Sequence, residues 1–235
     1  MDKPSAGVDE SADPVRASVN AFVRKVAAGA PEGARVLDAG AGECVYRALF
    51  SRQRYVAVDR GVGDRAWDYG KLDATADLER LPHGDATFDL VLCTETLEHV
   101  ARPGLVLSEL ARVLKPGGSL ALSVPFLHPV HQAPHDYFRY TPHGLKMLLE
   151  AAGLRPGAVE AAGGYFLYLY WQLQALPAHL PLGLGLRPRT WLTWPLRAAI
   201  RLAAAFLRGS AWRLRRTGAP DARPLQYFVI ARRAE

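Results

Sequence analysis

A short apolar run that ends in an acid and two closely spaced glycines constrains the fold of this chain most. Arg35-Val-Leu-Asp38 is typical of a buried strand, and it leads directly into Asp38-Ala-Gly40-Ala-Gly42-Glu-Cys44. Glycines in such a turn let the backbone approach a ligand where a Cβ atom would collide. We expect a helix to begin after the turn and to offer the unpaired N–H groups of its first residues. The pattern therefore predicts a strand, a ligand-binding turn and a helix.

Other short apolar runs without strict alternation are typical of parallel strands that are covered on both faces. They are Tyr55-Val-Ala-Val58, Phe88-Asp-Leu-Val-Leu-Cys93, Ser119-Leu-Ala-Leu-Ser-Val124 and Leu225-Gln-Tyr-Phe-Val-Ile-Ala231. Helical patterns occupy residues 15–28, 106–114 and 141–152, and the first of them opens at Asp13-Pro14. This alternation predicts an α/β fold, a Rossmann-like, mainly parallel seven-stranded sheet with helices on both faces, plus a helical insertion before the last strand.

The length of 235 residues suits a single domain, which we place at residues 14–235. Residues 1–13 are polar and acidic, without the basic and apolar segments of a signal peptide, and we expect a disordered lead-in there. Cys44 and Cys93 are isolated, so they predict neither a disulfide framework nor a paired metal site. We therefore expect a reducing, cytoplasmic location.

The glycine turn differs from that of proteins that bind nicotinamide dinucleotides. Val45 stands where the last glycine of G-x-G-x-x-G would be. Asp38 precedes the first glycine, and a carboxylate suits the cationic methionine end of a sulfonium nucleoside better than a pyrophosphate. Asp59 closes the second strand, where it would either accept the two ribose hydroxyls or serve as a helix cap or solvated turn residue. Together these features favour S-adenosyl-L-methionine over a dinucleotide.

An ordered set of motifs between Arg35 and Leu154 resembles the class I methyltransferases, and within them the type 11 family. That family is similar to the ubiquinone and menaquinone C-methyltransferases. The motifs are Val36-Leu-Asp-Ala-Gly-Ala-Gly42, Val56-Ala-Val-Asp59, Asp77-Leu-Glu-Arg-Leu-Pro82 with Phe88-Asp-Leu-Val91, Leu97-Glu-His-Val100 and Val113-Leu-Lys-Pro-Gly-Gly118.

The resemblance implies binding of S-adenosyl-L-methionine and release of the product S-adenosyl-L-homocysteine. It implies a cofactor site made by Asp38, Ala39, Gly40, Gly42, Asp59, Asp77, Leu78, Cys93, Thr94 and His99. Asp38, Gly40 and Gly42 would hold the methionine end, and Asp59 the ribose. Asp77 would bind the adenine amino group, with Leu78 beside it. Cys93 and Thr94 would border the methionine moiety, near His99.

Two departures from the family pattern affect this site. Cys44 replaces the third small residue of the turn, which concerns packing of the following segment more than binding. Only seventeen residues separate Asp59 from Asp77, which leaves little room for a second helix. Asp73 therefore competes with Asp77 for the adenine role, and the spacing to Leu81-Pro82 favours Asp77.

The segment between Pro125 and Tyr140 follows a predicted strand and should face the same crevice as the cofactor. One interpretation is a rigid loop in which Asp136 and Arg139 pair structurally. A second makes His131 or His135 a general base, because the pKa of histidine lies near working pH, with Tyr137 or Arg139 orienting the acceptor. A third is a metal site of His128, His131 and His135, whose spacing is not a strong zinc signature. We predict His131, His135 and Tyr137 as catalytic and no metal.

Positive charge is concentrated near the end of the chain. Residues 161–220 contain eight arginines and no acid, so this segment has a formal charge of +8. Because the net charge of the whole chain is +6, the remaining residues sum to −2. Residues 165–221 form a basic, apolar helical insertion that would act as a lid or as a membrane-contact element. Proline and glycine argue against a transmembrane helix. A stripe of Arg197, Arg201, Arg208 and Arg215 within residues 187–216 suits anionic headgroups at the inner membrane face, and no nucleic-acid-binding motif is present.

These features predict an S-adenosylmethionine-dependent methyltransferase that acts on a small-molecule or lipid-linked acceptor at oxygen, nitrogen or carbon. One alternative is a non-catalytic S-adenosylmethionine-binding sensor or partner protein. A nicotinamide-dependent oxidoreductase is disfavoured by the glycine spacing.

Overall fold

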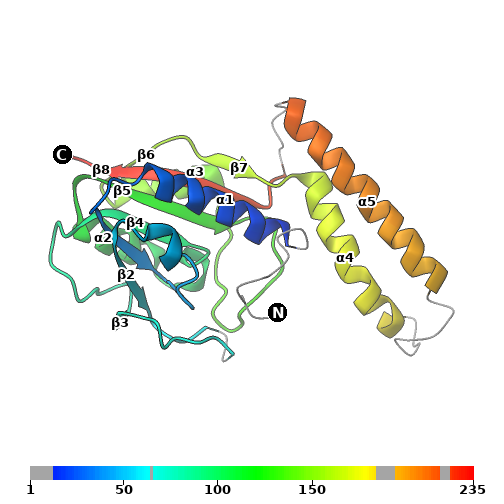
Figure 1. Cartoon of the computed structure of the whole chain (residues 1–235), viewed down its shortest axis with the longest axis horizontal. Coiled ribbons are helices and arrows are strands. Elements are labelled where there is room, and N and C mark those ends of the chain that lie inside the picture. Colours follow the sequence, from blue (N-terminus) through cyan, green and yellow to red (C-terminus); the bar gives the residue numbers. More distant parts are fainter. Residues whose placement is uncertain (1–12, 64–65, 184–193, 218–222) are drawn as a thin grey trace.

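One mixed sheet forms the centre of the computed structural model, which describes residues 13–63, 66–183, 194–217 and 223–235 (Figure 1). Its strands are β1 (Arg35–Ala39), β2 (Arg54–Asp59), β3 (Ala74–Thr75), β4 (Phe88–Thr94), β5 (Leu114–Pro125), β6 (Leu154–Pro156), β7 (Glu160–Ala162) and β8 (Gln226–Arg233). The order is β3-β2-β1-β4-β5-β8-β6, and β7 also pairs with β8. The strand order reverses between β1 and β4, where ligands bind in open α/β sheets.

Neighbouring strands from β3 to β5 are parallel, and β8 runs antiparallel to β5. The α/β fold with a mainly parallel sheet is therefore as predicted, but the sheet has eight strands and not seven. The additional strand arises because β8 pairs with a different three-residue strand at each end. Residues 226–228 of β8 pair with β7, and residues 231–233 pair with β6.

Helices cover both faces of the sheet, as expected. On one face, α2 (Pro103–Val113) and α3 (Pro142–Ala151) bury Leu107, Leu110 and Leu145 against β4 and β5. On the other face, α1 (Pro14–Gly29) buries valines and Phe22, whose ring stacks on Phe228 of β8. Side chains along β4 point alternately to the two faces of the sheet. Val91 and Cys93 face α2, while Leu90 and Leu92 face α1.

The predicted helix starts are confirmed by their caps. The Asp13 carboxylate accepts from the backbone N–H groups of Val15 and Arg16 at 3.0 and 3.1 Å, and Pro14 occupies the first turn of α1. The Thr141 hydroxyl accepts from the backbone N–H of Gly144 at 3.1 Å, and α3 follows.

The helix expected directly after the glycine turn does not form. A run of turns there leads into a short 3₁₀ helix, η1 (Arg47–Phe50). Gly42 and Cys44 have φ values of +51° and +58°. Left-handed residues interrupt a right-handed helix. The N–H groups of Gly40, Gly42 and Cys44 instead donate to the Val58 carbonyl, the Asp59 carboxylate and the Ala41 carbonyl.

The insertion before β8 consists of α4 (Tyr165–Gly183) and α5 (Trp194–Thr217), which pack side by side and project from the sheet domain (Figure 1). The α4 helix continues through Pro177 and Pro181, two of the residues that argued against a transmembrane helix. Leu167 and Tyr170 anchor the start of α4 against Val15 and Leu225. Within the described ranges, no helix combines the length and the hydropathy needed to span a membrane.

Parts of two predictions lie outside the described residues. Residues 1–12 hold all but the last residue of the predicted lead-in, and residues 184–193 and 218–222 belong to the insertion.

Candidate functional site

A cavity of about 480 Å³ opens where β1, β2 and β4 end. Its lining includes seven of the ten predicted cofactor residues: Gly40, Gly42, Asp59, Asp77, Leu78, Thr94 and His99. It also includes His128, His131, His135 and Tyr137 from the loop after β5. The fold thus brings the predicted cofactor and acceptor sides together around one space.

Gly40 forms the floor of the cavity and has no room for a side chain. Its φ is +84°, and a Cβ atom there would lie 2.3 Å from the Thr96 side chain. Its N–H donates to the carbonyl of Val58 at 2.8 Å, which ties the turn to the end of β2. The missing side chain at Gly40 therefore makes room for Thr96, which packs directly against the turn.

Asp59 is held at the end of β2 by two backbone N–H groups. Its Oδ2 accepts from Gly42 at 3.0 Å and its Oδ1 accepts from Gly61 at 2.7 Å. The carboxylate lines the cavity with a fixed orientation. This is the arrangement needed to accept the two hydroxyls of a ribose.

The segment after β2 builds a wall that the sequence analysis did not identify. Trp67 and Tyr69 line the cavity, and the Trp67 ring lies 3.3 Å from a Cβ atom built on Gly42. The sequence held a signal for this wall, because both aromatic residues lie in a loop that directly follows a strand of the parallel sheet. Their rings supply an apolar surface beside Asp59.

The structure distinguishes the two acids that competed for the adenine role. Asp77 lines the cavity, and its Oδ1 accepts from the backbone N–H of Glu79 at 3.0 Å. Asp73 accepts from the backbone N–H of Ala57 at 2.8 Å and pairs with Arg47 at 2.7 Å. Asp73 therefore serves the packing of β2, while Asp77 is placed to meet a ligand.

Three predicted cofactor residues lie behind the cavity and not on its surface. Asp38, Ala39 and Cys93 are at most 1% exposed, and the residues that line the cavity do not include them. Asp38 accepts a hydrogen bond from the Tyr55 hydroxyl. Burial raises the pKa of Asp38 to about 7, although this hydrogen bond lowers it. Burial also raises the pKa of the Cys93 thiol.

The loop after β5 is fixed by an ion pair, as one of the sequence interpretations predicted. Arg139 donates to both carboxylate oxygens of Asp136, at 2.6 and 2.8 Å, and also to the carbonyls of His128 and Pro129. The Asp136 side chain is only 2% exposed. The hydrogen bonds from Arg139 hold the pKa of this carboxyl well below its usual range.

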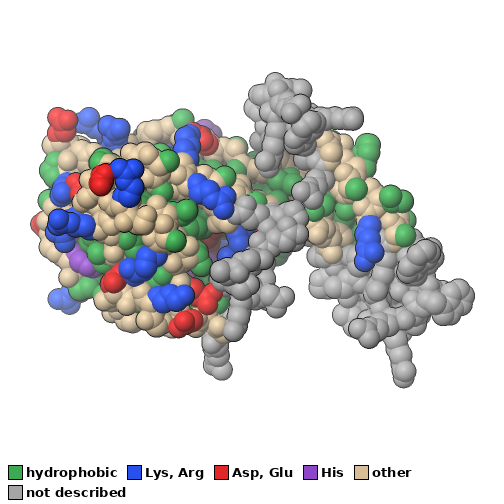
Figure 2. All heavy atoms as spheres, in the orientation of Figure 1, with side chains coloured by type: hydrophobic (Ala, Val, Ile, Leu, Met, Phe, Trp, Pro, Cys, Tyr) green, Lys and Arg blue, Asp and Glu red, His purple; other side chains and the backbone are tan. Residues whose placement is uncertain are grey.

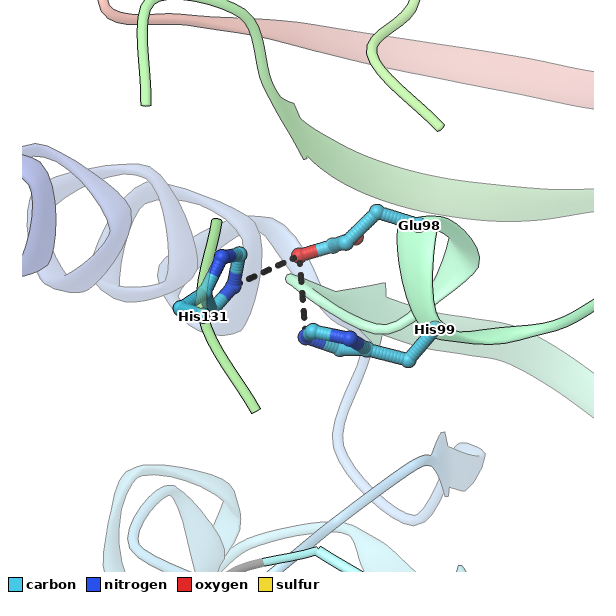
Figure 3. A group of neighbouring side chains, drawn as sticks. All are labelled: Glu98, His99 and His131. Carbon is cyan, nitrogen blue, oxygen red and sulfur yellow. Dashed lines mark ion pairs between the residues drawn. The ribbon is translucent and has the colours of Figure 1, made fainter. Parts of the chain in front are cut away.

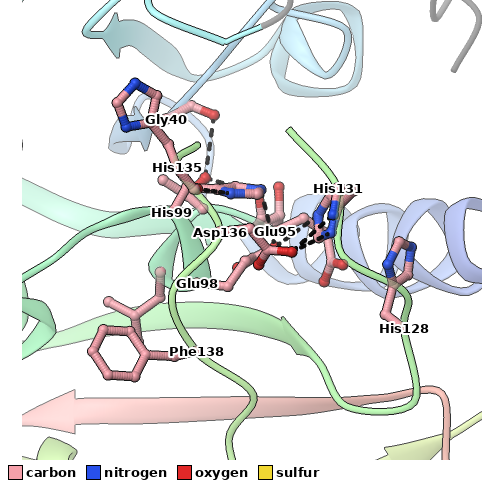
Figure 4. Close-up of polar contacts among 12 residues, drawn as sticks. Gly40, Glu95, Glu98, His99, His128, His131, His135, Asp136 and Phe138 are labelled. Carbon is pink, nitrogen blue, oxygen red and sulfur yellow. Dashed lines mark hydrogen bonds and ion pairs between the residues drawn. The ribbon is translucent and has the colours of Figure 1, made fainter. Parts of the chain in front are cut away.

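The loop histidines occupy different environments (Figure 4). His131 is enclosed, and burial together with the neighbouring imidazoles lowers its pKa to about 4, so the ring is neutral at pH 7. His135 is half-buried, and its Nδ1 lies 3.2 Å from the hydroxyl of Tyr137, which is exposed. Tyr137 is therefore the predicted catalytic group with the freest access to a molecule in the cavity.

His128, His131 and His135 do not come together as a three-histidine cluster. The His128 ring lies 4.3 Å from the His131 ring and 5.0 Å from that of Trp171 in α4, measured between centroids, whereas His135 turns to Tyr137. His131 instead lies against His99 and Glu98, which belong to a second 3₁₀ helix, η2 (Leu97–His99). Sequence reasoning did not select Glu98, because a buried and an exposed glutamate look the same in a sequence.

A family model described as a methyltransferase domain, type 11, matches residues 37–122. The demethylmenaquinone methyltransferase of Parafrankia sp. is 32% identical over 121 residues, 50% of this chain and 44% of that protein. The ubiquinone biosynthesis O-methyltransferase of Caulobacter vibrioides is 37% identical over 110 residues, 41% of this chain and 43% of that protein. The chain thus aligns with less than half the length of these two relatives.

Solved structures share the fold at low sequence identity. The [4+2]-cyclase SpnF is 18% identical with a TM-score of 0.55, covering 90% of this chain and 80% of that one. Phosphoethanolamine N-methyltransferase 2 of Haemonchus contortus, in complex with phosphomonomethylethanolamine and S-adenosylhomocysteine, is 15% identical with a TM-score of 0.55, covering 93% of this chain and 53% of that one. The ordered motifs, the sheet and the family match agree: residues 37–122 match a type 11 methyltransferase domain, and the chain shares the fold of these solved structures.

Proposed function

We propose that the protein transfers a methyl group from S-adenosyl-L-methionine to a small-molecule or lipid-linked acceptor, at oxygen, nitrogen or carbon. One observation carries the proposal. The Gly40 turn and the Asp59 carboxylate stand at the ends of adjacent parallel strands and line one cavity. The turn offers backbone without side chains, and the carboxylate offers acceptors for hydroxyl groups. The residues present therefore fit a nucleoside with an amino acid tail.

The chemistry requires mainly proximity and alignment. S-adenosyl-L-methionine, when bound, supplies a methyl group that its sulfonium already activates. An acceptor held in line needs no further activation unless its nucleophile carries a proton that must leave. His135 and Tyr137 lie at the cavity and can hold or accept such a proton. Burial lowers the pKa of His131 to about 4, which makes its imidazole a weak base.

Removal of the imidazole at position 135 tests the catalytic part of this proposal. We expect His135→Ala to lower kcat at least tenfold, with little change in affinity for S-adenosyl-L-homocysteine, because a base acts on the acceptor and not on the nucleoside. His143→Ala, on the exposed side of α3, is the matched control. Normal turnover by His135→Ala would remove the base role of that residue.

Binding and turnover together test the proposal as a whole. Calorimetry should show micromolar affinity for S-adenosyl-L-methionine and its demethylated product and none for NAD. Release of S-adenosyl-L-homocysteine should then be measured with phenols, quinols and amines as acceptors. Tight binding without release for any acceptor favours a sensor or partner protein, and affinity for NAD alone favours an oxidoreductase. Failure to bind the sulfonium nucleoside or its product would contradict the proposal.

The α4–α5 pair supports a lipid-linked acceptor. On α5, Ile200 and Ala204 are buried, whereas Leu202 and Phe206 are 73% and 71% exposed beside Arg201. Apolar side chains appear on the surface of this helical pair in Figure 2. No described residue of α4 or α5 lines the cavity, which favours membrane contact over a lid. The two relatives named above carry names that refer to quinone biosynthesis or to a menaquinone.

Vesicle flotation tests the membrane contact. We expect the protein to float with vesicles that contain phosphatidylglycerol and less with pure phosphatidylcholine, because arginines add attraction to anionic headgroups. Replacing Leu202 and Phe206 by serine should reduce binding, whereas Met147→Ser, at an exposed position of α3, should not. Equal flotation by the wild-type protein and the double variant would contradict this role of α5.

A further inference from the structure

Three side chains that could ligate a metal converge beside the cavity (Figure 3). Glu98 and His99 come from η2, and His131 comes from the loop after β5. Glu98 Oε1 lies 3.5 Å from His99 Nε2 and 3.8 Å from His131 Nε2. One ligand atom from each residue lies within 4.8 Å of the other two. The cluster joins two segments that are more than thirty residues apart.

Glu98 is the least accommodated polar group in this cluster. Its side chain is 0% exposed, and neither carboxylate oxygen has a hydrogen-bond partner among the described residues. His99 Nε2 is likewise buried and without a partner in the same part of the chain. Burial of an unpaired carboxylate is costly. A bound cation would satisfy these atoms together.

The hydrogen bond of His99 leaves the nitrogen that faces Glu98 free to bind a metal, and the two acceptors beside His131 Nδ1 favour the same tautomer in that ring. His99 Nδ1 lies 2.6 Å from the carbonyl oxygen of His135, so it must donate, and Nε2 of the neutral ring then carries a lone pair. His131 Nδ1 lies 3.3 Å from both Asp136 Oδ2 and the Pro129 carbonyl, with an Arg139 nitrogen at 3.4 Å. Carbonyl and carboxylate groups behind metal-binding histidines orient such rings in many proteins.

The donor set indicates the kind of metal. Two imidazole nitrogens and one carboxylate oxygen suit Zn²⁺ and its first-row neighbours better than Mg²⁺ or Ca²⁺. Ligand atoms about 2.0–2.1 Å from a tetrahedral ion lie roughly 3.3 Å apart, close to the observed 3.5 and 3.8 Å. His99 and His131 line the cavity, so the remaining coordination positions would open into it.

We propose that Glu98, His99 and His131 form a binding site for one divalent transition-metal ion that is open to the cavity. The site differs from the three-histidine alternative in the sequence, with which it shares only His131. It is an alternative to our prediction of no metal, and the titration described next decides between the two. It stands apart from the proposed function, because none of its evidence depends on a methyl donor or an acceptor.

Direct metal binding to the full chain tests the site. Chelator-treated protein is titrated with Zn²⁺ by calorimetry and with Co²⁺ by visible absorption, in the absence of any nucleoside. We expect one ion per chain, with the absorption bands of a Co²⁺ ion bound by nitrogen and oxygen. Glu98→Gln, His99→Ala and His131→Ala should each weaken binding at least tenfold. His135→Ala removes an imidazole from the same loop, and His143→Ala one from α3, and both should bind as the wild-type protein does.

Thermal unfolding without metal shows which variants still fold, and the rise in Tm upon addition of Zn²⁺ is then measured for each of those. The proposal predicts a rise for the wild-type protein and both controls and no rise for Glu98→Gln. Absence of stoichiometric binding, or equal binding by Glu98→Gln and the wild-type protein, would overturn it. Greater stability of Glu98→Gln with no metal bound would identify Glu98 as a buried, protonated acid instead. Affinity for S-adenosyl-L-homocysteine, measured separately, shows whether the proposed function stands or fails independently.

Discussion

At the scale of single residues, the most direct test of the cofactor site is to add a side chain at Gly40, where the structure leaves no room for one. Gly40→Ala would bring its Cβ atom 2.3 Å from Thr96 at a φ of +84°. We expect affinity for S-adenosyl-L-homocysteine to fall at least tenfold, because the turn must shift away from the cavity. Gly104→Ala in α2, where nothing lies within 4 Å of an added Cβ atom, is the control in the same calorimetric titration. Unchanged affinity of Gly40→Ala would argue against the turn as the binding floor.

Asp38 gives a pH dependence with a defined sign. Burial raises its pKa from 3.8 to about 7, so the folded protein holds a proton that the unfolded chain has released. The stability that this proton contributes is present below pH 4 and is lost as the pH rises towards 7. We therefore expect Asp38→Asn to gain stability relative to the wild-type protein between pH 5 and 7.5, measured by urea unfolding. The histidines titrate in both proteins, so their contribution drops out when the two free energies of unfolding are subtracted at each pH.

The same residue illustrates what a sequence can and cannot reveal. The position of Asp38 before the glycines was enough to associate it with the cofactor. Its burial and its bond to Tyr55, seventeen residues away, depend on strand pairing that no local pattern specifies. Asp73 and Asp77 could likewise be ranked by spacing, but their separate environments emerged only from the fold.

At the scale of elements, the loop after β5 depends on the pair of Asp136 and Arg139. Asp136→Asn should destabilise the protein by about 3 kcal/mol, because it leaves a partly buried guanidinium without its carboxylate. Asp136→Asn combined with Arg139→Met should cost less than the sum of the two single changes. Glu32→Gln, which breaks an exposed pair with Arg52, should cost at most about 1 kcal/mol. Additive effects at positions 136 and 139 would show that the pair does not act as a unit.

Elements with a strong local signal were predictable, and those that depend on a partner were not. The runs that became β1, β2, β4, β5 and β8 are apolar in themselves. Glu160-Ala-Ala162 has no strand character and forms β7 because β8 offers it an edge. The helix expected after the glycine turn failed because Cys44 adopts a positive φ, which its residue type does not announce.

At the scale of the whole molecule, ligand binding should be visible as global stabilisation. S-adenosyl-L-homocysteine at one hundred times its Kd should add about 2.7 kcal/mol to the free energy of unfolding. For a chain of 235 residues this corresponds to a rise in Tm of roughly 5–10 °C. NAD at the same concentration is the control in a thermal scan. An equal rise with both compounds would show that the cavity does not discriminate between them.

The backbone hydrogen bond that closes the base of the α4–α5 pair has a consequence for engineering. The N–H of Leu225 donates to the carbonyl of Ala162 at 2.8 Å, so the chain leaves the sheet beside β7 and returns to it one strand away. Because the two ends of the α4–α5 insertion lie side by side, another segment can replace it with little disturbance to the sheet domain. Chimeras that graft foreign helices between these two residues would keep the described lining of the cavity intact. They offer a modular way to change which surface the protein contacts.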